Sequence, residues 1–141
     1  MAIQDYLVYV PLVLSLIAFA FSIFTYRRSR RERFYADIDS MYLGILKIGI
    51  DHPEFVNPKN TTDYMNRFKD ENELLRYETY AYIVWNLCET IYDRRDDDLF
   101  NTWRTVIVAE NKLHRKWLDD PENHHKFKGE FLKYVQHEFP L

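Results

Sequence analysis

The sequence predicts an all-α protein in which an N-terminal transmembrane helix continues into a cytoplasmic bundle of about four helices. The first observation is an uncharged, apolar run over residues 6–26. The second is composition. Aromatic residues make up 17% of the 141 residues, against 3 glycines and 5 prolines, which excludes disordered and glycine-rich β proteins. The third is that apolar residues after the run recur at helical spacing.

The apolar run predicts a transmembrane anchor over residues 1–26. As a helix the run is roughly 31 Å long, enough to cross the hydrocarbon core of a bilayer. A cleaved signal peptide is the alternative, because Ala18 and Ala20 have the spacing of a cleavage site. Against it, the preceding residues carry Asp5 and no Lys or Arg, and the run continues beyond Ala20. Amphipathic rings are expected at the two headgroup levels, from Tyr6, Tyr9 and Tyr26.

Residues 27–33 are predicted to form a basic collar that contacts membrane lipids. The collar contains one acidic residue, Glu32, and has a net charge of +4, with its positive charges at Arg27, Arg28, Arg30, Arg31 and Arg33. Arginine in excess marks the cytoplasmic side of a membrane helix. We therefore expect a single-pass protein of the cell membrane, with the N-terminus outside and the C-terminal domain in the cytoplasm.

The domain after the collar, residues 34–141, is acidic. The whole chain carries −3, the collar +4 and Asp5 −1, which leaves −6 for this domain. Binding to nucleic acids needs clustered Lys and Arg, and the one dense basic cluster lies where lipid headgroups occupy it. No nucleic-acid partner is expected, and RNA binding by the collar is the weaker alternative.

Small residues predict a helix-packing seam along the anchor. Ser15, Ala18, Ser22 and Thr25 are three and four residues apart, so they share one stripe of a left-handed helix crossing. Small side chains let helices approach closely in lipid. The seam predicts a homo-oligomer or a complex with another membrane protein. The alternative is that Ser, Ala and Thr are simply common in membrane helices.

The first helix of the cytoplasmic domain is predicted to run out of the collar as far as Ile50. It ends at His52-Pro53, because the residue before a proline is pushed out of the α conformation. A connector follows, from Pro53 to about Thr62, with one short helical turn at residues 54–56. The predicted inward residues of the first helix are Phe34, Ile38, Met41, Tyr42, Ile45 and Leu46.

Three further helices complete the predicted bundle. The second is capped by Thr61 or Thr62 and is the central helix, because apolar residues occur on most of its sides. The third is capped by Asp97 or Asp98. The fourth begins at Asp120-Pro121-Glu122. The predicted inward residues are Leu74, Tyr77, Ala81, Val84, Trp85, Cys88, Ile91, Tyr92, Trp103, Val106, Ile107, Leu113, Trp117, Phe127, Phe131, Tyr134 and Val135.

Residue patterns that support catalysis or metal binding are scarce, so we expect no catalytic residue, metal or cofactor. One cysteine, Cys88, excludes a disulfide framework and a zinc module. Helical bundles that bind two irons use Glu-x-x-His pairs, whereas Glu110 and His114 are four residues apart and no second pair occurs. HEPN ribonucleases carry a signature in which an Arg is followed four to six residues later by a His. No histidine of this sequence has an Arg at those positions before it. We expect solvated surface histidines at His52, His114, His124, His125 and His137.

A possible polar site consists of Arg76, Asn86, Glu89 and Arg104. Asn86 and Glu89 are three residues apart and therefore neighbours on one helix face. If buried, they pair with Arg104 or with a tyrosine hydroxyl. A structural hydrogen-bond network is one interpretation. A ligand or partner site lined by tyrosines is the other.

The arrangement of anchor, basic collar and aromatic bundle resembles small prokaryotic, single-pass accessory proteins of uncharacterised function, some beside phage-defence systems. This resemblance implies no site residue. The leading hypothesis is a non-enzymatic membrane protein whose cytoplasmic domain serves interaction or regulation in an oligomer or larger membrane complex. An oligomeric membrane-pore effector of a defence system is the first alternative. A small helical hydrolase or nuclease is the second.

Overall fold

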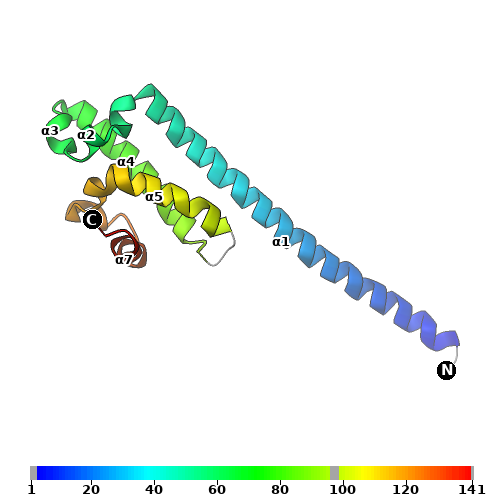
Figure 1. The fold of residues 1–141 in the computed structure, drawn as a ribbon. Helices are drawn as coiled ribbons and strands as arrows, with labels where there is room; N and C mark the ends of the chain where they lie inside the picture. Colours follow the sequence, from blue (N-terminus) through cyan, green and yellow to red (C-terminus); the bar gives the residue numbers. More distant parts are fainter. Residues whose placement is uncertain (1–2, 96–98, 141) are drawn as a thin grey trace. The chain divides into compact units, whose positions relative to one another are not determined.

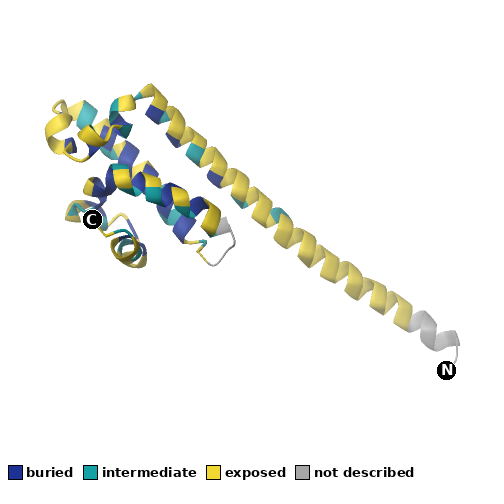
Figure 2. Ribbon diagram, in the orientation of Figure 1, coloured by how far each residue is buried: buried dark blue, intermediate teal, exposed yellow. Residues whose placement is uncertain are grey.

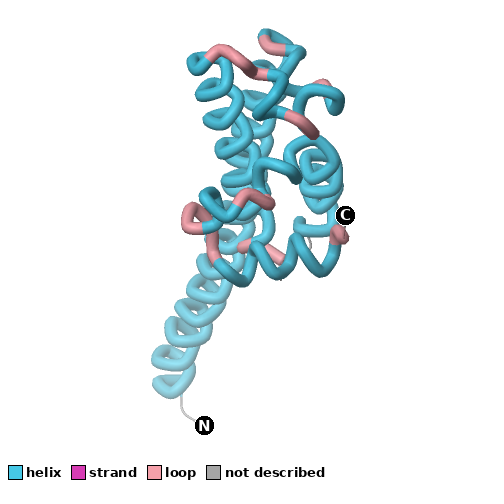
Figure 3. The backbone as a smooth tube through the Cα atoms, turned by 90° about the vertical axis from the view of Figure 1, so that its left-hand side faces the viewer, coloured by secondary structure: helices cyan, strands magenta, loops and turns pink. Residues whose placement is uncertain are grey.

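The structure, a computed structural model, describes the backbone of residues 3–95 and 99–140 and the side chains of residues 9–95 and 100–140. Over these residues the chain is helical without strands (Figure 3), and helices account for 86%. The prediction of an all-α protein is confirmed. Contacts within the chain divide it into two units, residues 1–37 and 38–141. The predicted division at residues 26 and 33 concerns the membrane and stays a prediction.

Helix α1 (Ile3–Asp51) is 49 residues long and includes Pro11. It contains an 18-residue window with a mean hydropathy of 1.9, none of which is buried. Residues 9–28 are all exposed, as the uniform colour of this stretch in Figure 2 shows. One N-terminal helix is thus long and apolar enough to span a membrane.

The second unit is built around α4 (Glu71–Tyr92), which packs most extensively against α5 (Leu99–Leu118). The central position of α4 agrees with its composition, because the helix carries buried apolar side chains on several of its sides. The tryptophans of the chain, Trp85, Trp103 and Trp117, are all buried in this unit. The fully buried residues of α4 are Tyr77, Ala81, Val84, Trp85, Leu87 and Cys88.

The C-terminal part of α1 contributes one face to the second unit. Ile38 and Ile45 are buried, and Gly49 lies so close to the next element that a Cβ atom would come within 3.0 Å of Val56 Cγ1. Met41 and Leu46, which were predicted to point inward, are exposed instead. The buried positions follow a narrower stripe than the apolar positions do, because only one side of this helix meets a neighbour.

The connector is more helical than predicted. It contains η1 (Pro53–Val56) and α2 (Pro58–Thr61), and α3 (Tyr64–Arg67) follows it where the central helix was predicted to begin; each is four residues long (Figure 1). The prediction that Thr61 or Thr62 caps the central helix was wrong. The cap is Asp70, whose Oδ1 accepts a hydrogen bond from the Glu73 amide at 3.0 Å.

The C-terminal segment forms two helices and not the single one predicted. Asp120 caps α6 (Pro121–His124), as predicted, by accepting from the Glu122 amide at 3.0 Å. The chain then turns, and α7 (Gly129–Glu138) begins beyond it. Backbone bonds from the Lys126 and Phe127 amides to the Asn123 and His124 carbonyls close this turn. The Asn123 side-chain amide donates to the Trp117 carbonyl at 2.8 Å and joins α6 to α5. The predicted caps of α5, Asp97 and Asp98, lie outside the described residues. A bundle of four helices is therefore not confirmed.

Truncation of Leu87 to Ala is expected to lower the free energy of unfolding by about 2–5 kcal/mol, because it leaves a cavity in the α4–α5 packing. Leu75, on the same helix, is exposed, so Leu75→Ala is expected to change stability by no more than about 0.5 kcal/mol. Urea unfolding of the full chain in detergent, followed by tryptophan fluorescence, measures both. Equal losses in the two variants would contradict this packing.

Candidate functional site

A buried pair of ionisable residues, Glu110 and His114, lies on the inner face of α5. The His114 side chain is 0% exposed and that of Glu110 is 7% exposed, and His114 Nε2 lies 3.6 Å from Glu110 Oε2. On the other ring edge, His114 Nδ1 hydrogen bonds to the Tyr77 hydroxyl at 3.2 Å. The prediction that His114 is a solvated surface residue was therefore wrong. Its spacing already indicated burial, because Glu110 and His114 continue the 4-3-4-3 stripe of Trp103, Ile107 and Trp117.

The pair lies in surroundings of low polarity with little hydrogen bonding. Glu110 Oε2 and His114 Nε2 are buried without a hydrogen-bond partner in the described part of the chain. Burial raises the pKa of Glu110 to about 7 and lowers the pKa of His114 to about 3. In both cases removal from water disfavours the charged form. Between these values the carboxyl holds its proton and the imidazole is neutral, so the pair carries no net charge.

Helices α1 and α4 supply the other ionisable groups that face Glu110. Tyr42 comes from α1, and Tyr80 and Cys88 from α4. Burial raises the pKa of each, and the nearby Glu110 carboxylate raises it further. These groups stay protonated at neutral pH, so none of them supplies a cation to balance a charged Glu110. The cluster can exchange a proton but offers a substrate no access.

A second buried polar residue, Arg115, joins α5 to the end of α7. Its Nε donates to Asp119 Oδ1 at 2.7 Å, and its Nη1 donates to the Phe139 carbonyl at 2.7 Å and to Asn111 Oδ1 at 3.2 Å. The Nε and Nη1 donors of the guanidinium therefore both make charge-assisted hydrogen bonds. Its role is to hold the C-terminus of the described chain against α5.

The four residues of the predicted polar site have separate surroundings. Glu89 Oε1 accepts a hydrogen bond from the Lys128 amide at 2.7 Å, and Arg104 Nη2 donates to Glu138 Oε2 at 3.2 Å. Asn86 is half-buried on α4, and Arg76 is exposed at the edge of a groove. Glu89 and Arg104 do not pair with each other, because Lys128, the N-cap residue of α7, binds Glu89 and Glu138 of α7 binds Arg104.

Two open grooves border the exposed side of α4. The first has a volume of about 330 Å³ and is lined by Ile48, His52, Phe55, Leu75, Arg76, Thr79, Tyr80 and Ile83. The second has a volume of about 390 Å³ and is lined by Leu75, Glu78, Thr79, Tyr82 and Lys126. Tyr80 connects the first groove to the buried cluster, because its ring also meets the His114 ring at 5.4 Å.

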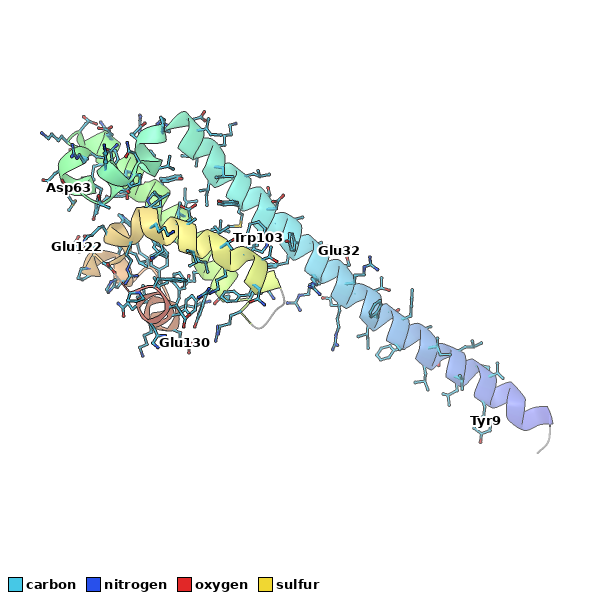
Figure 4. All side chains as sticks on the ribbon, in the orientation of Figure 1. Tyr9, Glu32, Asp63, Trp103, Glu122 and Glu130 are labelled. Carbon is cyan, nitrogen blue, oxygen red and sulfur yellow. The ribbon has the colours of Figure 1, made fainter. Side chains whose placement is uncertain are left out.

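The residues predicted to face lipid or a partner helix lie in the first unit. The seam residues Ser15, Ala18, Ser22 and Thr25 are all exposed. The Ser15 hydroxyl donates within the helix, to the Leu12 carbonyl at 2.8 Å. Tyr9 projects from α1 (Figure 4).

The aromatic and basic flanks of the apolar run are also exposed. Tyr26 is exposed, and in the collar Arg28 Nε binds Glu32 Oε1 at 2.9 Å. The remaining arginines of the collar, Arg27, Arg30, Arg31 and Arg33, are exposed as well. The side chain of Tyr6 lies outside the described residues. Contact of these residues with lipid, and of the seam with another helix, stays a prediction.

Neither metal-binding geometry nor similarity assigns a function to these residues. Over the described side chains, no group of three or more His, Cys, Asp or Glu residues is placed to hold a metal ion. The chain matches no family model, no curated protein and no solved structure.

Replacement of Glu110 by Gln is expected to remove a pH dependence of stability. The folded protein raises the pKa of Glu110 from 4.5 to about 7, so it binds this proton more tightly than the unfolded chain does. Glu110 therefore destabilises the fold increasingly as pH rises from about 4.5 to about 7. The glutamine amide stays neutral at every pH. The free energy of unfolding of E110Q should therefore rise relative to that of the wild type, by roughly 3 kcal/mol, between about pH 5 and about pH 8. Urea unfolding at each pH measures the difference.

Glu130→Gln is the matched control, because the Glu130 side chain is 81% exposed on α7 (Figure 4). This variant should follow the wild type at every pH. His114 is present in all three proteins, so its own titration cancels in the comparison. A stability difference between E110Q and the wild type that stays constant from about pH 5 to about pH 8 would contradict a buried, proton-binding Glu110.

Proposed function

We propose that this chain is a non-enzymatic, single-pass protein of the cell membrane whose helical domain serves interaction or regulation in the cytoplasm. The observation that carries the proposal is the exposed, uncharged helix over residues 9–26, followed directly by the basic collar. An uncharged apolar helix of this length matches the thickness of the hydrocarbon core of a bilayer, and contact with lipid removes its apolar surface from water. The collar supplies the positive charge that keeps a flank on the cytoplasmic side and attracts anionic headgroups.

The surfaces of the second unit support an interaction role over a catalytic one. Its buried acid–base pair, Glu110 and His114, is closed to solvent. The groove that includes Ile48, Phe55 and Ile83 is lined largely by apolar and aromatic side chains, which suit a protein partner better than a reaction centre. The seam along the anchor supports association with a second copy or another membrane helix. Membrane lipids are the remaining proposed partner.

Ile17→Lys is expected to reduce retention in the membrane, because a lysine near the centre of a spanning helix costs about 2.5–3.5 kcal/mol. Ser29→Lys, which adds the same charge to the collar, should leave retention unchanged. Alkaline extraction of membranes, followed by quantification of the chain in pellet and supernatant, measures both variants. Full retention of Ile17→Lys, or release of the wild type, would overturn the proposed anchor.

The proposed orientation can be tested with introduced cysteines, because the native Cys88 is fully buried. A cysteine at Asn57, which is exposed in the second unit, should react with a membrane-impermeant maleimide only after the cells are opened. A cysteine at Ala2 should react in intact cells. The opposite labelling pattern would show that the N-terminus is cytoplasmic and would overturn the orientation.

A further inference from the structure

The buried cluster around Glu110 has one weakly attached wall, the C-terminal part of α1. Glu110 and His114 belong to α5, which packs extensively against α4. Residues 38–51 of α1 meet these two helices less extensively. In the part of the chain that the structure describes, no hydrogen bond or ion pair joins this segment to α4 or α5. It is held by side-chain packing alone, so it separates at a lower cost in free energy than α4 and α5 do.

Tyr42 is the residue with which α1 covers the cluster. It lies near both Glu110 and Cys88, and burial raises its pKa. Its ring also meets the Trp103 ring edge-on, with the centroids 6.0 Å apart. Ile45, three residues further along the same helix, is buried. Separation of this part of α1 from α4 and α5 would therefore bring water to Glu110 and to Cys88 together.

The closed cluster suits an uncharged Glu110 and not a carboxylate. Glu110 Oε2 is buried without a hydrogen-bond partner in the described part of the chain. The ionisable groups that face Glu110 are His114 of its own helix, Tyr42 of α1, and Tyr80 and Cys88 of α4. None of these groups is a cation at neutral pH. A carboxylate formed here would lack both water and a counter-ion, and this is a large cost for a buried charge.

We infer that residues 38–51 of α1 form a proton-controlled clamp, which is closed over a protonated Glu110 and separates from α4 and α5 when this carboxyl ionises. The carboxyl releases its proton to water, and hydration in the open state replaces the hydrogen bonds that the cluster does not supply. The proton thus acts as a ligand of the closed clamp. The inference goes beyond the proposed function and does not depend on the anchor, because it concerns contacts within residues 38–141 alone.

Opening of the clamp becomes more favourable as pH rises. The closed clamp raises the pKa of Glu110 from 4.5 to about 7, and hydration in the open clamp returns it to its ordinary value. The closed clamp therefore binds the proton more tightly, and the equilibrium constant for opening rises between about pH 4.5 and about pH 7 and is constant above. Between about pH 5.5 and about pH 7.5 the rise is roughly twentyfold. E110Q should show no such rise, because its amide does not titrate.

Labelling of the native Cys88 thiol measures this opening, because Cys88 is fully buried and is the only cysteine of the chain. The full chain in mild detergent is labelled with dithiodipyridine. At each pH, the labelling rate of the wild type is divided by that of E110Q, so that the intrinsic pH dependence of thiol reactivity cancels. This ratio is expected to rise roughly twentyfold between about pH 5.5 and about pH 7.5. A constant ratio would overturn the inference.

Division of the wild-type rate by that of free glutathione at the same pH should give the same profile. This second measurement does not require that E110Q folds. A profile without a rise up to about pH 7 would also overturn the inference.

A matched pair of introduced cysteines separates the clamp from unfolding of the whole domain. Ile45→Cys and Val135→Cys, each combined with Cys88→Ala, place a thiol at a buried aliphatic position of α1 or of α7, 2% and 0% exposed. Each is labelled with and without E110Q. The ratio of rates at position 45 should rise with pH as it does at Cys88, whereas the ratio at position 135 should stay constant. Equal rises at the two positions would show that the whole domain opens, and a constant ratio at position 45 would show that α1 does not; either result would overturn the inference.

Discussion

The packing of α4 against α5 is the interaction on which the rest of the helical domain depends. Trp85 is fully buried between them, and its indole N–H donates to the His114 carbonyl at 3.0 Å. The two ends of the domain attach to the same helix. Phe55 of η1 meets the Tyr77 ring at 5.8 Å, and Phe131 of α7 meets the Trp85 ring at 6.1 Å. Large aromatic side chains fill this small core because each buries much apolar area.

Patterns that depend on neighbouring residues were predictable from the sequence. The extent of apolar residues around α4 predicted its central position, and Asp120-Pro121-Glu122 predicted the start of α6, because capping is a local interaction. The apolar run predicted the long N-terminal helix because it, too, is a pattern of neighbouring residues. In contrast, the cap at Asp70 was not predictable, because Thr61 and Thr62 upstream suit the capping position equally well. The two threonines belong to the helical turns of the connector, and this leaves Asp70 as the cap.

Features that depend on distant residues were not predictable in the same way. The burial of His114 is not one of them, because the stripe of Trp103, Ile107 and Trp117 on its own helix already indicated it. The partners of Glu89 and Arg104 lie 39 and 34 residues away in the sequence. No spacing rule reaches that far. Their hydrogen bonds follow from where α7 packs, which is a property of the folded domain.

The hydrogen bond from the Lys128 amide to Glu89 has a consequence for the order in which the chain folds. Helix α7 has 10 residues, fewer than an isolated helix needs to be stable in water. Its first turn is supported by a carboxylate that belongs to α4, so it forms on a surface that must already exist. During synthesis the side of Trp85 that Phe131 covers therefore stays uncovered until α7 has left the ribosome.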